Sequence, residues 1–213
     1  MRQTHTLLAL WIAGCAPQSE PTLSETQLAL SRQVGIPEST FQTIRRAAKT
    51  DLVALHPLDS AGTVLPPRGL VFGLPASGMR TTLAKLRQTL GDAYLVFEAD
   101  RGYTYHPDSI GIVHTRDTME LLRVMVTSGV NYGIYTDSVI SVVRHWRDSL
   151  GFRLEAGGGD WLEGSFPSPQ PDFDSLAVLV YAFCPDVVDQ GANTVPGLAV
   201  EMRKIGKLFC WWD

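Results

Sequence analysis

The sequence predicts an α+β fold, in which helices pack on a mixed or mainly antiparallel sheet in a single main domain. Segments with helical spacing alternate with short apolar runs of strand length. Several neighbouring strand segments are joined too tightly for the crossover that parallel strands need. In addition, 45% of the 213 residues are hydrophobic and 19% are charged, a composition that can bury a core. These three observations favour helices on a sheet over an all-helical or doubly wound fold.

The N-terminal part is predicted to be mainly helical. Residues 24–49 have helical spacing, interrupted near Gly35, Ile36 and Pro37. Ser39 and Gln42 have the spacing of a capping box, which predicts a second helix start there.

A short strand and a long loop are expected next. Residues 52–55 are apolar and of strand length, and residues 56–69 are rich in Pro, Gly and Asp. We therefore divide the chain into an N-terminal helical segment and loop, residues 24–68, and the α+β domain, residues 69–213.

Within the α+β domain, each element is predicted from apolar spacing and from a capping or stop residue. Strands are expected at residues 70–74, 94–98, 110–114, 152–156, 161–166 and 208–212. Helices are expected at residues 79–90, 117–128, 136–150, 172–183 and 194–205. Glycines follow several of these helices as stops, and residues 157–160 form the turn of a hairpin.

The first fifteen residues have the layout of an export signal. Arg2 precedes the apolar residues 7–13, and small residues stand before Cys15. The apolar run is too short to span a bilayer, which needs about 20 residues. Ile12-Ala13-Gly14-Cys15 resembles the lipobox of bacterial lipoproteins, which implies removal of a signal peptide, residues 1–14, and diacylation of Cys15.

Residues 15–23 are polar and contain prolines, as expected of a tether. The predicted location is the cell envelope, with the protein lipid-anchored to a membrane; in a Gram-negative host this is the outer membrane or the periplasmic face. The membrane is bound through the lipid on Cys15, and a protein partner is the second expected contact.

The charge balance excludes some partners. The chain has 18 basic and 22 acidic residues, a net charge of −4, and no block of Lys and Arg. We therefore expect no nucleic-acid binding. No cofactor is predicted, because a strand follows the triple glycine before Asp160 where a phosphate cradle needs a helix. No metal site is predicted, since the acidic residues lack calcium-loop spacing.

Two cysteines remain once Cys15 is assigned to lipid. Cys184 and Cys210 would close a loop of roughly 26 residues, and a disulfide of that size is worth on the order of 3 kcal/mol. Two buried thiols that pack as small hydrophobes are the alternative. The sequence leaves both possibilities open.

Candidate catalytic residues lie in one segment: Cys184, Asp186 and Asp189. Pro185 suits the first turn of a helix, and a thiol at a helix start is activated by backbone N–H groups. Cys184 is then a candidate nucleophile, with either aspartate orienting a histidine base. The alternative is that Cys184 fills a helix junction while the aspartates cap backbone amides.

No histidine is placed beside Cys184 by the sequence. The candidates for a base are His56, His106, His114 and His145.

Candidate binding residues are polar or aromatic side chains of the last third of the chain: Asp160, Trp161, Gln190, Trp212 and Asp213. Adjacent tryptophans on a strand point to opposite faces, so at most one of Trp211 and Trp212 faces a given core. The other lies under a helix or forms a recognition surface for a partner or a sugar. The Asp213 carboxylates anchor the end of the sheet or complete a site.

Several C-terminal motifs together resemble one bacterial family, the domain of unknown function 4253. The motifs are Asp137-Ser138-Val139-Ile140 leading to Trp146, Gly158-Gly159-Asp160-Trp161, Phe183-Cys184-Pro185-Asp186, Val188-Asp189-Gln190-Gly191 and Trp211-Trp212-Asp213. The resemblance is strongest over residues 100–213. It implies no activity, but it implies that Cys184, Asp186, Asp189, Gln190 and Asp213 lie together in the fold.

The expected function is that of a membrane-anchored bacterial lipoprotein. Its domain is predicted to be a non-catalytic binding or protective, immunity-like module of the cell envelope, because no complete catalytic set can be assembled. The alternative is a thiol-dependent enzyme, a hydrolase or transferase, that uses Cys184 with Asp186 or Asp189.

Overall fold

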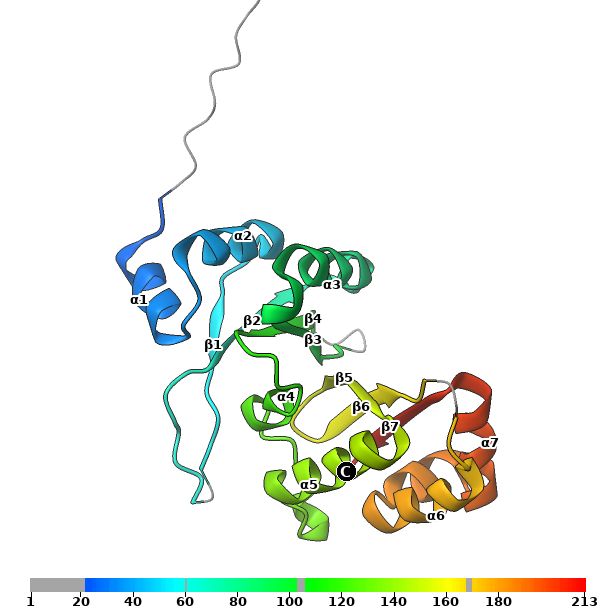
Figure 1. Cartoon of the computed structure of the whole chain (residues 1–213). Helices are drawn as coiled ribbons and strands as arrows, with labels where there is room; N and C mark the ends of the chain where they lie inside the picture. The colour runs from blue at the N-terminus through cyan, green and yellow to red at the C-terminus, as the bar shows by residue number, and fades with distance from the viewer. Residues whose placement is uncertain (1–21, 60, 103–105, 168–169) are drawn as a thin grey trace, which may run out of the picture.

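The computed structural model describes residues 22–59, 61–102, 106–167 and 170–213. The predicted signal peptide, Cys15 and nearly all of the predicted tether lie outside the described residues. Among the described residues, seven strands form one sheet in the order β1-β2-β4-β3-β5-β6-β7 (Figure 1).

Strand pairing is antiparallel throughout, except at one junction. The strands are β1 (Val53–Leu55), β2 (Gly69–Leu74), β3 (Leu95–Asp100), β4 (Asp108–Val113), β5 (Arg153–Gly157), β6 (Trp161–Ser165) and β7 (Lys207–Trp211). β3 and β5 run parallel and pair only at Glu98 and Ala156. The sheet is therefore mixed, which confirms the predicted fold class.

The helices follow the predicted order. They are α1 (Glu25–Gln33), α2 (Glu38–Ala48), α3 (Ala76–Leu90), α4 (Glu120–Val124), α5 (Thr136–Leu150), α6 (Phe173–Phe183) and α7 (Val195–Ile205). Short 3-10 helices occupy Gly91–Ala93 (η1) and Val130–Tyr132 (η2), and Val187–Ala192 form a π-helical turn (η3).

Two groups of helices cover opposite faces of the sheet (Figure 1). α1, α2 and α3 pack on one face of the β1–β4 half, where Phe41 and Ile44 meet Phe72 and Ile110 in one apolar core. α4 to α7 pack on the opposite face, and their core extends across β3 and the strands β5 to β7. Because both cores share one sheet, the chain forms a single compact domain.

Helix α2 begins at a different cap from the predicted one. Pro37, with φ −56°, precedes the first helical residue, and Ser39 therefore lies inside the helix. The capping box is formed at α1 instead, where Ser24 and Gln27 bond each other's backbone N–H groups. Proline fixes the backbone angle that a helix start needs, so it sets the position of the start.

The helix predicted over residues 117–128 is much shorter in the structure. α4 ends at Val124, and Val126 has φ +54°, which turns the chain out of the helix. The buried Thr127 hydroxyl then donates to the Gly158 carbonyl oxygen at 2.7 Å. The Ser128 N–H also leaves the helix and donates to the Gly159 carbonyl oxygen at 2.8 Å, so a backbone bond to the β5–β6 turn replaces the one that would continue the helix.

Prediction for the sheet. Phe97 on β3 is fully buried and lies opposite Gly111 on β4, and a Cβ at Gly111 would come within 2.3 Å of the Phe97 ring. We expect Gly111→Ala to lower the free energy of unfolding by about 1–3 kcal/mol, because the aromatic ring has to move in a packed core. Urea unfolding monitored by circular dichroism measures the change.

Gly78→Ala in α3 is the matched control, because the nearest atom to its Cβ would be at 3.7 Å, an ordinary contact. We expect this variant to gain up to about 1 kcal/mol from helix propensity. Equal effects of the two substitutions would contradict the steric argument.

Candidate functional site

Cys184 lies at the junction of two helical segments: it caps the end of α6, and the helical turn that ends at Ala192 begins after Pro185. Its N–H donates to the Val180 carbonyl oxygen and closes the last turn of α6, so the residue also belongs to the end of a helix, which the sequence did not predict. Among the described residues, no backbone N–H donates to the Cys184 sulfur, so this geometry does not show the expected activation by N–H groups. The apolar stripe of α6 continues up to Phe183 and carries Cys184 into the core.

The Cys184 thiol is fully buried and donates to the Trp211 carbonyl oxygen at 2.8 Å. Cys184 and Cys210 are both free thiols and both buried. Burial raises the pKa of the Cys210 thiol, and the neighbouring Cys184 raises it further. In this structure the two cysteines therefore occupy the buried-thiol state, one of the two alternatives that the sequence leaves open.

Among the described residues, no histidine is hydrogen-bonded to Cys184. His56 contacts the Leu65 carbonyl oxygen, and His114 contacts that of Gly35. His106 contacts the carbonyl oxygen of the adjacent proline, and His145 is exposed on α5. The nucleophile and base of a thiol enzyme are therefore not assembled here.

Asp186 is a buried carboxylate that holds the end of the chain. The Tyr132 hydroxyl donates to Asp186 Oδ1 at 2.5 Å, and the Gln190 side-chain amide donates to the same oxygen at 3.0 Å. The backbone N–H of Asp213 donates to Oδ2 at 2.8 Å. We call these four residues the C-terminal clamp.

The clamp shifts two pKa values. Burial of Asp186 opposes ionisation, but its three hydrogen bonds outweigh that effect and lower the pKa of the carboxyl group. The hydrogen bond between Tyr132 and Asp186 raises the pKa of Tyr132 to about 12, because the carboxylate disfavours a phenolate beside it. Asp186 is thus ionised, and both of its oxygens accept hydrogen bonds. Its role in this structure is to hold the neighbouring groups in place.

The other residues of the segment lie around the clamp. Asp189 is exposed and accepts a hydrogen bond from the Tyr181 hydroxyl at 3.1 Å, which raises the pKa of Tyr181. The Asn131 side chain donates to the Asp213 carbonyl oxygen at 2.9 Å. The structure therefore brings Asp186, Gln190 and Asp213 into direct contact, while Asp189 faces α6.

Trp211 and Trp212 point to opposite faces of β7, as the alternation of a strand requires. Trp212 is buried, and its ring meets Phe183 edge to face with centroids 5.2 Å apart. Its indole N–H donates to the Phe183 carbonyl oxygen at 3.2 Å. Trp212 is therefore a core residue. Trp211 is half-buried at the edge of the sheet, where its ring lies beside Gly191 and packs against the core of α4–α7.

The face of β5, β6 and β7 opposite to α4–α7 carries polar and aromatic side chains, of which Trp161 is buried and the others are half-buried. They are Glu155, Trp161, Glu163, Ser165, Lys207, Phe209 and Trp211, joined by Glu98 and Arg101 from the neighbouring end of β3. We call this surface the open half-face. The three helices α1 to α3 cover only the other half of the same sheet face, at β1 to β4.

Alternating charges bind the open half-face together. Arg101 pairs with Glu98 at 2.7 Å and with Glu163 at 2.8 Å. Lys207 pairs with Glu163 and with Glu155, both at 2.9 Å. Burial raises the pKa of Glu163, but hydrogen bonds from Lys207 and Arg101 outweigh it and the pKa is lowered. Every charge of this row is therefore matched by an opposite one.

Aromatic rings line the end of the open half-face. The rings of Trp161 and Phe209 are 5.7 Å apart and tilted by 39°, and those of Phe209 and Trp211 are 5.4 Å apart and tilted by 32°. With Asp160 they enclose an open hollow of about 300 Å³, which we call the aromatic pocket.

Two of the pocket's residues, Asp160 and Trp161, were predicted from the sequence as binding candidates. Phe209 was missed, and of the two adjacent tryptophans Trp212 was predicted as the binding candidate, whereas Trp211 lines the pocket. The alternation of Phe209 and Trp211 with Leu208 and Cys210 along β7 is the signal that could have found them.

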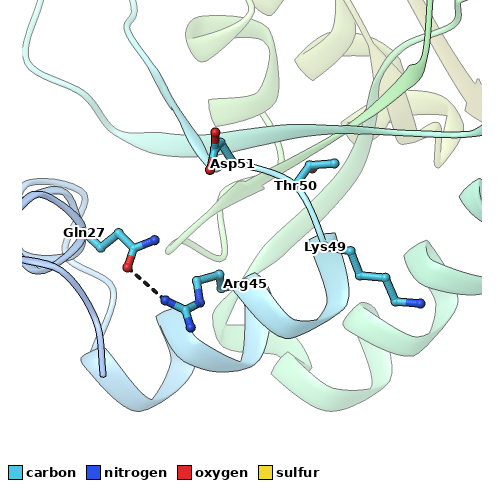
Figure 2. A pocket seen from close by; sticks show the side chains of 5 residues that line it. All are labelled: Gln27, Arg45, Lys49, Thr50 and Asp51. Carbon is cyan, nitrogen blue, oxygen red and sulfur yellow. Dashed lines mark hydrogen bonds between the residues drawn. The ribbon is translucent and has the colours of Figure 1, made fainter. Parts of the chain in front are cut away.

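A second hollow, of about 620 Å³, lies where α1, α2 and the approach to β1 meet (Figure 2). Its lining is polar: Gln27, Arg45, Lys49, Thr50 and Asp51. Figure 2 shows Arg45 turned toward Gln27, to which it donates at 2.9 Å, while Lys49 points away from both. Because the charged groups do not converge on one point, we assign no ligand to this hollow.

Within the described ranges, no group of three or more His, Cys, Asp or Glu residues is arranged to hold a metal ion. No helix in the same part of the chain has the length and apolarity to cross a bilayer.

Prediction for the thiols. We expect iodoacetamide to modify Cys184 and Cys210 in the native protein roughly a hundredfold more slowly than after denaturation, because both sulfurs are buried and labelling needs local opening. Mass spectrometry of a Cys15→Ser background measures the labelling. The exposed Val178 provides a control, since Val178→Cys should label at once in the folded protein. A native Cys184 that reacts as fast as this control would restore the nucleophile hypothesis.

Prediction for the clamp. We expect Asp186→Asn to lower the free energy of unfolding at pH 7 by about 1–3 kcal/mol, since it places an amide against the Asp213 N–H. The folded-state pKa of Asp186 is depressed, so its contribution is present above about pH 4, the ordinary aspartate value, and is lost as the pH falls further. Urea unfolding at pH 7 and pH 3 should show the difference from wild type shrinking at pH 3.

Asp189→Asn is the matched control for the clamp, because that carboxylate is exposed and has one hydrogen bond to a side chain. Its expected effect is within about 0.5 kcal/mol. In the Asp186→Asn protein, the pKa of Tyr132 should fall from about 12 toward 10, its ordinary value. A stability gap of the same size at both pH values would argue against an ionised Asp186.

The comparisons with known proteins concern only the C-terminal half of the chain. No curated protein and no solved structure matches the sequence. Residues 109–213 match the family model described as Domain of unknown function (DUF4253), which confirms the predicted resemblance over that half. The match includes the C-terminal clamp and the aromatic pocket, whereas Glu98 and Arg101 precede it.

Proposed function

We propose that the protein is a bacterial lipoprotein, anchored to a membrane of the cell envelope through lipid on Cys15. Its domain is a non-catalytic binding or protective, immunity-like module, and it binds a protein partner through the open half-face. The lipobox-like residues before Cys15 support the anchor. The tether between Cys15 and α1 is short, so the domain stays close to the membrane.

The binding role is supported by a difference in accessibility between the catalytic candidates and the aromatic side chains of the open half-face. Two of the three catalytic candidates are inaccessible: Cys184 is fully buried, and the buried Asp186 accepts three hydrogen bonds. The aromatic side chains of Phe209 and Trp211 are instead half-buried and line an open hollow together with Asp160. Partly exposed aromatic residues above a rigid sheet are typical of recognition surfaces.

Prediction for the anchor. Wild-type protein grown with a palmitate analogue should carry the label and sediment with membranes. Cys15→Ser should lose both the label and the membrane association, because the diacylglyceryl group is joined to the cysteine sulfur through a thioether. Cys210→Ser is the control, and it should keep the label. Unlabelled wild-type protein recovered with its leader in the cytosol would refute the anchor.

Prediction for the binding face. Intact protein is purified in mild detergent from its own membranes, and co-purifying proteins are identified for wild type, Trp211→Ala and Tyr135→Ala. Tyr135 is 65% exposed and lies outside the open half-face, so its variant controls for the loss of any exposed aromatic ring. We expect a partner retained by wild type and Tyr135→Ala to be lost, by at least about tenfold, from Trp211→Ala.

Circular dichroism must show that Trp211→Ala remains folded. A partner that binds all three proteins equally would remove the open half-face from the proposal.

A further inference from the structure

We infer that the aromatic pocket binds an alkylammonium group, carried by a small amine or by a lysine side chain of a protein partner. This inference rests on the proposed binding function and names the chemistry that the same surface recognises. Its basis is the combination of three aromatic rings with one carboxylate, Asp160, in a single hollow.

The rings supply a wall of suitable size and shape. Trp161, Phe209 and Trp211 follow one another at centroid distances of 5.7 and 5.4 Å. The hollow of about 300 Å³ that they line is at the lower end of the usual size of small-ligand sites. The faces of aromatic rings carry partial negative charge and attract cations, and tryptophan does so most strongly.

Asp160 adds the one full charge of the lining. Its carboxylate is exposed, and it forms no hydrogen bond or ion pair with any residue in the described part of the chain. The other carboxylates of the surface differ, since Glu98 and Glu163 are both paired with Arg101. Asp160 is therefore an unneutralised negative charge beside aromatic rings, and this pairing favours a cation over an anion or a neutral sugar.

The protein itself already places a cation on these rings. The Arg101 guanidinium carbon lies 4.8 Å from the centroid of Trp161 and 5.4 Å from that of Phe209. Glu98 and Glu163 neutralise this guanidinium, so its repulsion of a second cation is small. Trp211 has no such cation among the described residues, and its ring is available together with Asp160.

The test compares a cation with an uncharged molecule of the same shape. Choline and its uncharged carbon isostere are titrated separately into the full-length protein in detergent, and tryptophan fluorescence is recorded. A second pair represents a lysine side chain. It consists of Nα-acetyl-lysine methylamide, which is charged at Nε, and the same compound acetylated at Nε, which is uncharged. We expect the charged member of at least one pair to bind about tenfold more tightly than the uncharged member.

Substitutions assign the effect to the pocket. Asp160→Asn should reduce this preference for the charged member to about twofold or less, and it should leave the fold intact because the carboxylate has no partner among the described residues. Glu201→Gln removes an exposed carboxylate from α7 and should change nothing. Trp211→Ala should weaken the binding of both members of the pair.

Two outcomes would overturn the inference: equal affinity for the charged and uncharged members in both pairs, or an unchanged preference in Asp160→Asn. The proposed function has its own readout. If Trp211→Ala loses a partner while neither cation is preferred, the binding role stands and the ammonium specificity is wrong. If the wild type prefers the charged member but Trp211→Ala keeps every protein partner, the pocket binds a small amine, and the proposal that this surface binds a protein partner is wrong.

Discussion

The Asp186 carboxylate fixes the C-terminal end of the chain, and the outward surface of the sheet depends on that constraint. β7 is the last strand at the edge of the sheet, and it pairs only with β6. A terminal edge strand would fray if nothing held it. The Asp213 N–H donates to the Asp186 carboxylate and holds the end of β7 in place. The Trp212 N–H donates to the Asp160 carbonyl oxygen at 2.9 Å and joins this end to the β5–β6 turn.

Once β7 is fixed, the alternation of its side chains separates buried residues from half-buried ones. Leu208, Cys210 and Trp212 are buried in the core beneath α5 to α7, whereas Phe209 and Trp211 are half-buried and line the aromatic pocket. The Cys184 thiol serves the same arrangement, since it donates to the carbonyl oxygen of Trp211. The buried Cys184 thiol and the ionised Asp186 are catalytic candidates in the sequence, but in the structure both form hydrogen bonds that hold β7 and its end in place.

The open half-face requires both halves of the chain. The aromatic rings come from β6 and β7, within the residues that match the family model, but Arg101 and Glu98 come from the end of β3, before that match. The parallel junction of β3 and β5 brings these parts together. An irregularity in the β5–β6 register between Leu154 and Ala156 accompanies the position of Glu155, which reaches Lys207 across the surface.

The sequence by itself determined the order and the type of most elements, because apolar periodicity and stop residues such as Gly151 and Gly206 act within a few neighbouring residues. It also located the segment around Asp186 and the pocket residues Asp160 and Trp161. Tertiary structure alone decided which atoms meet. The end of α4 depends on the bonds from Thr127 and Ser128 to the distant residues Gly158 and Gly159, and the burial of Cys184 depends on where β7 lies. Such contacts join residues that are distant in the chain, so neither local spacing nor residue type can specify them.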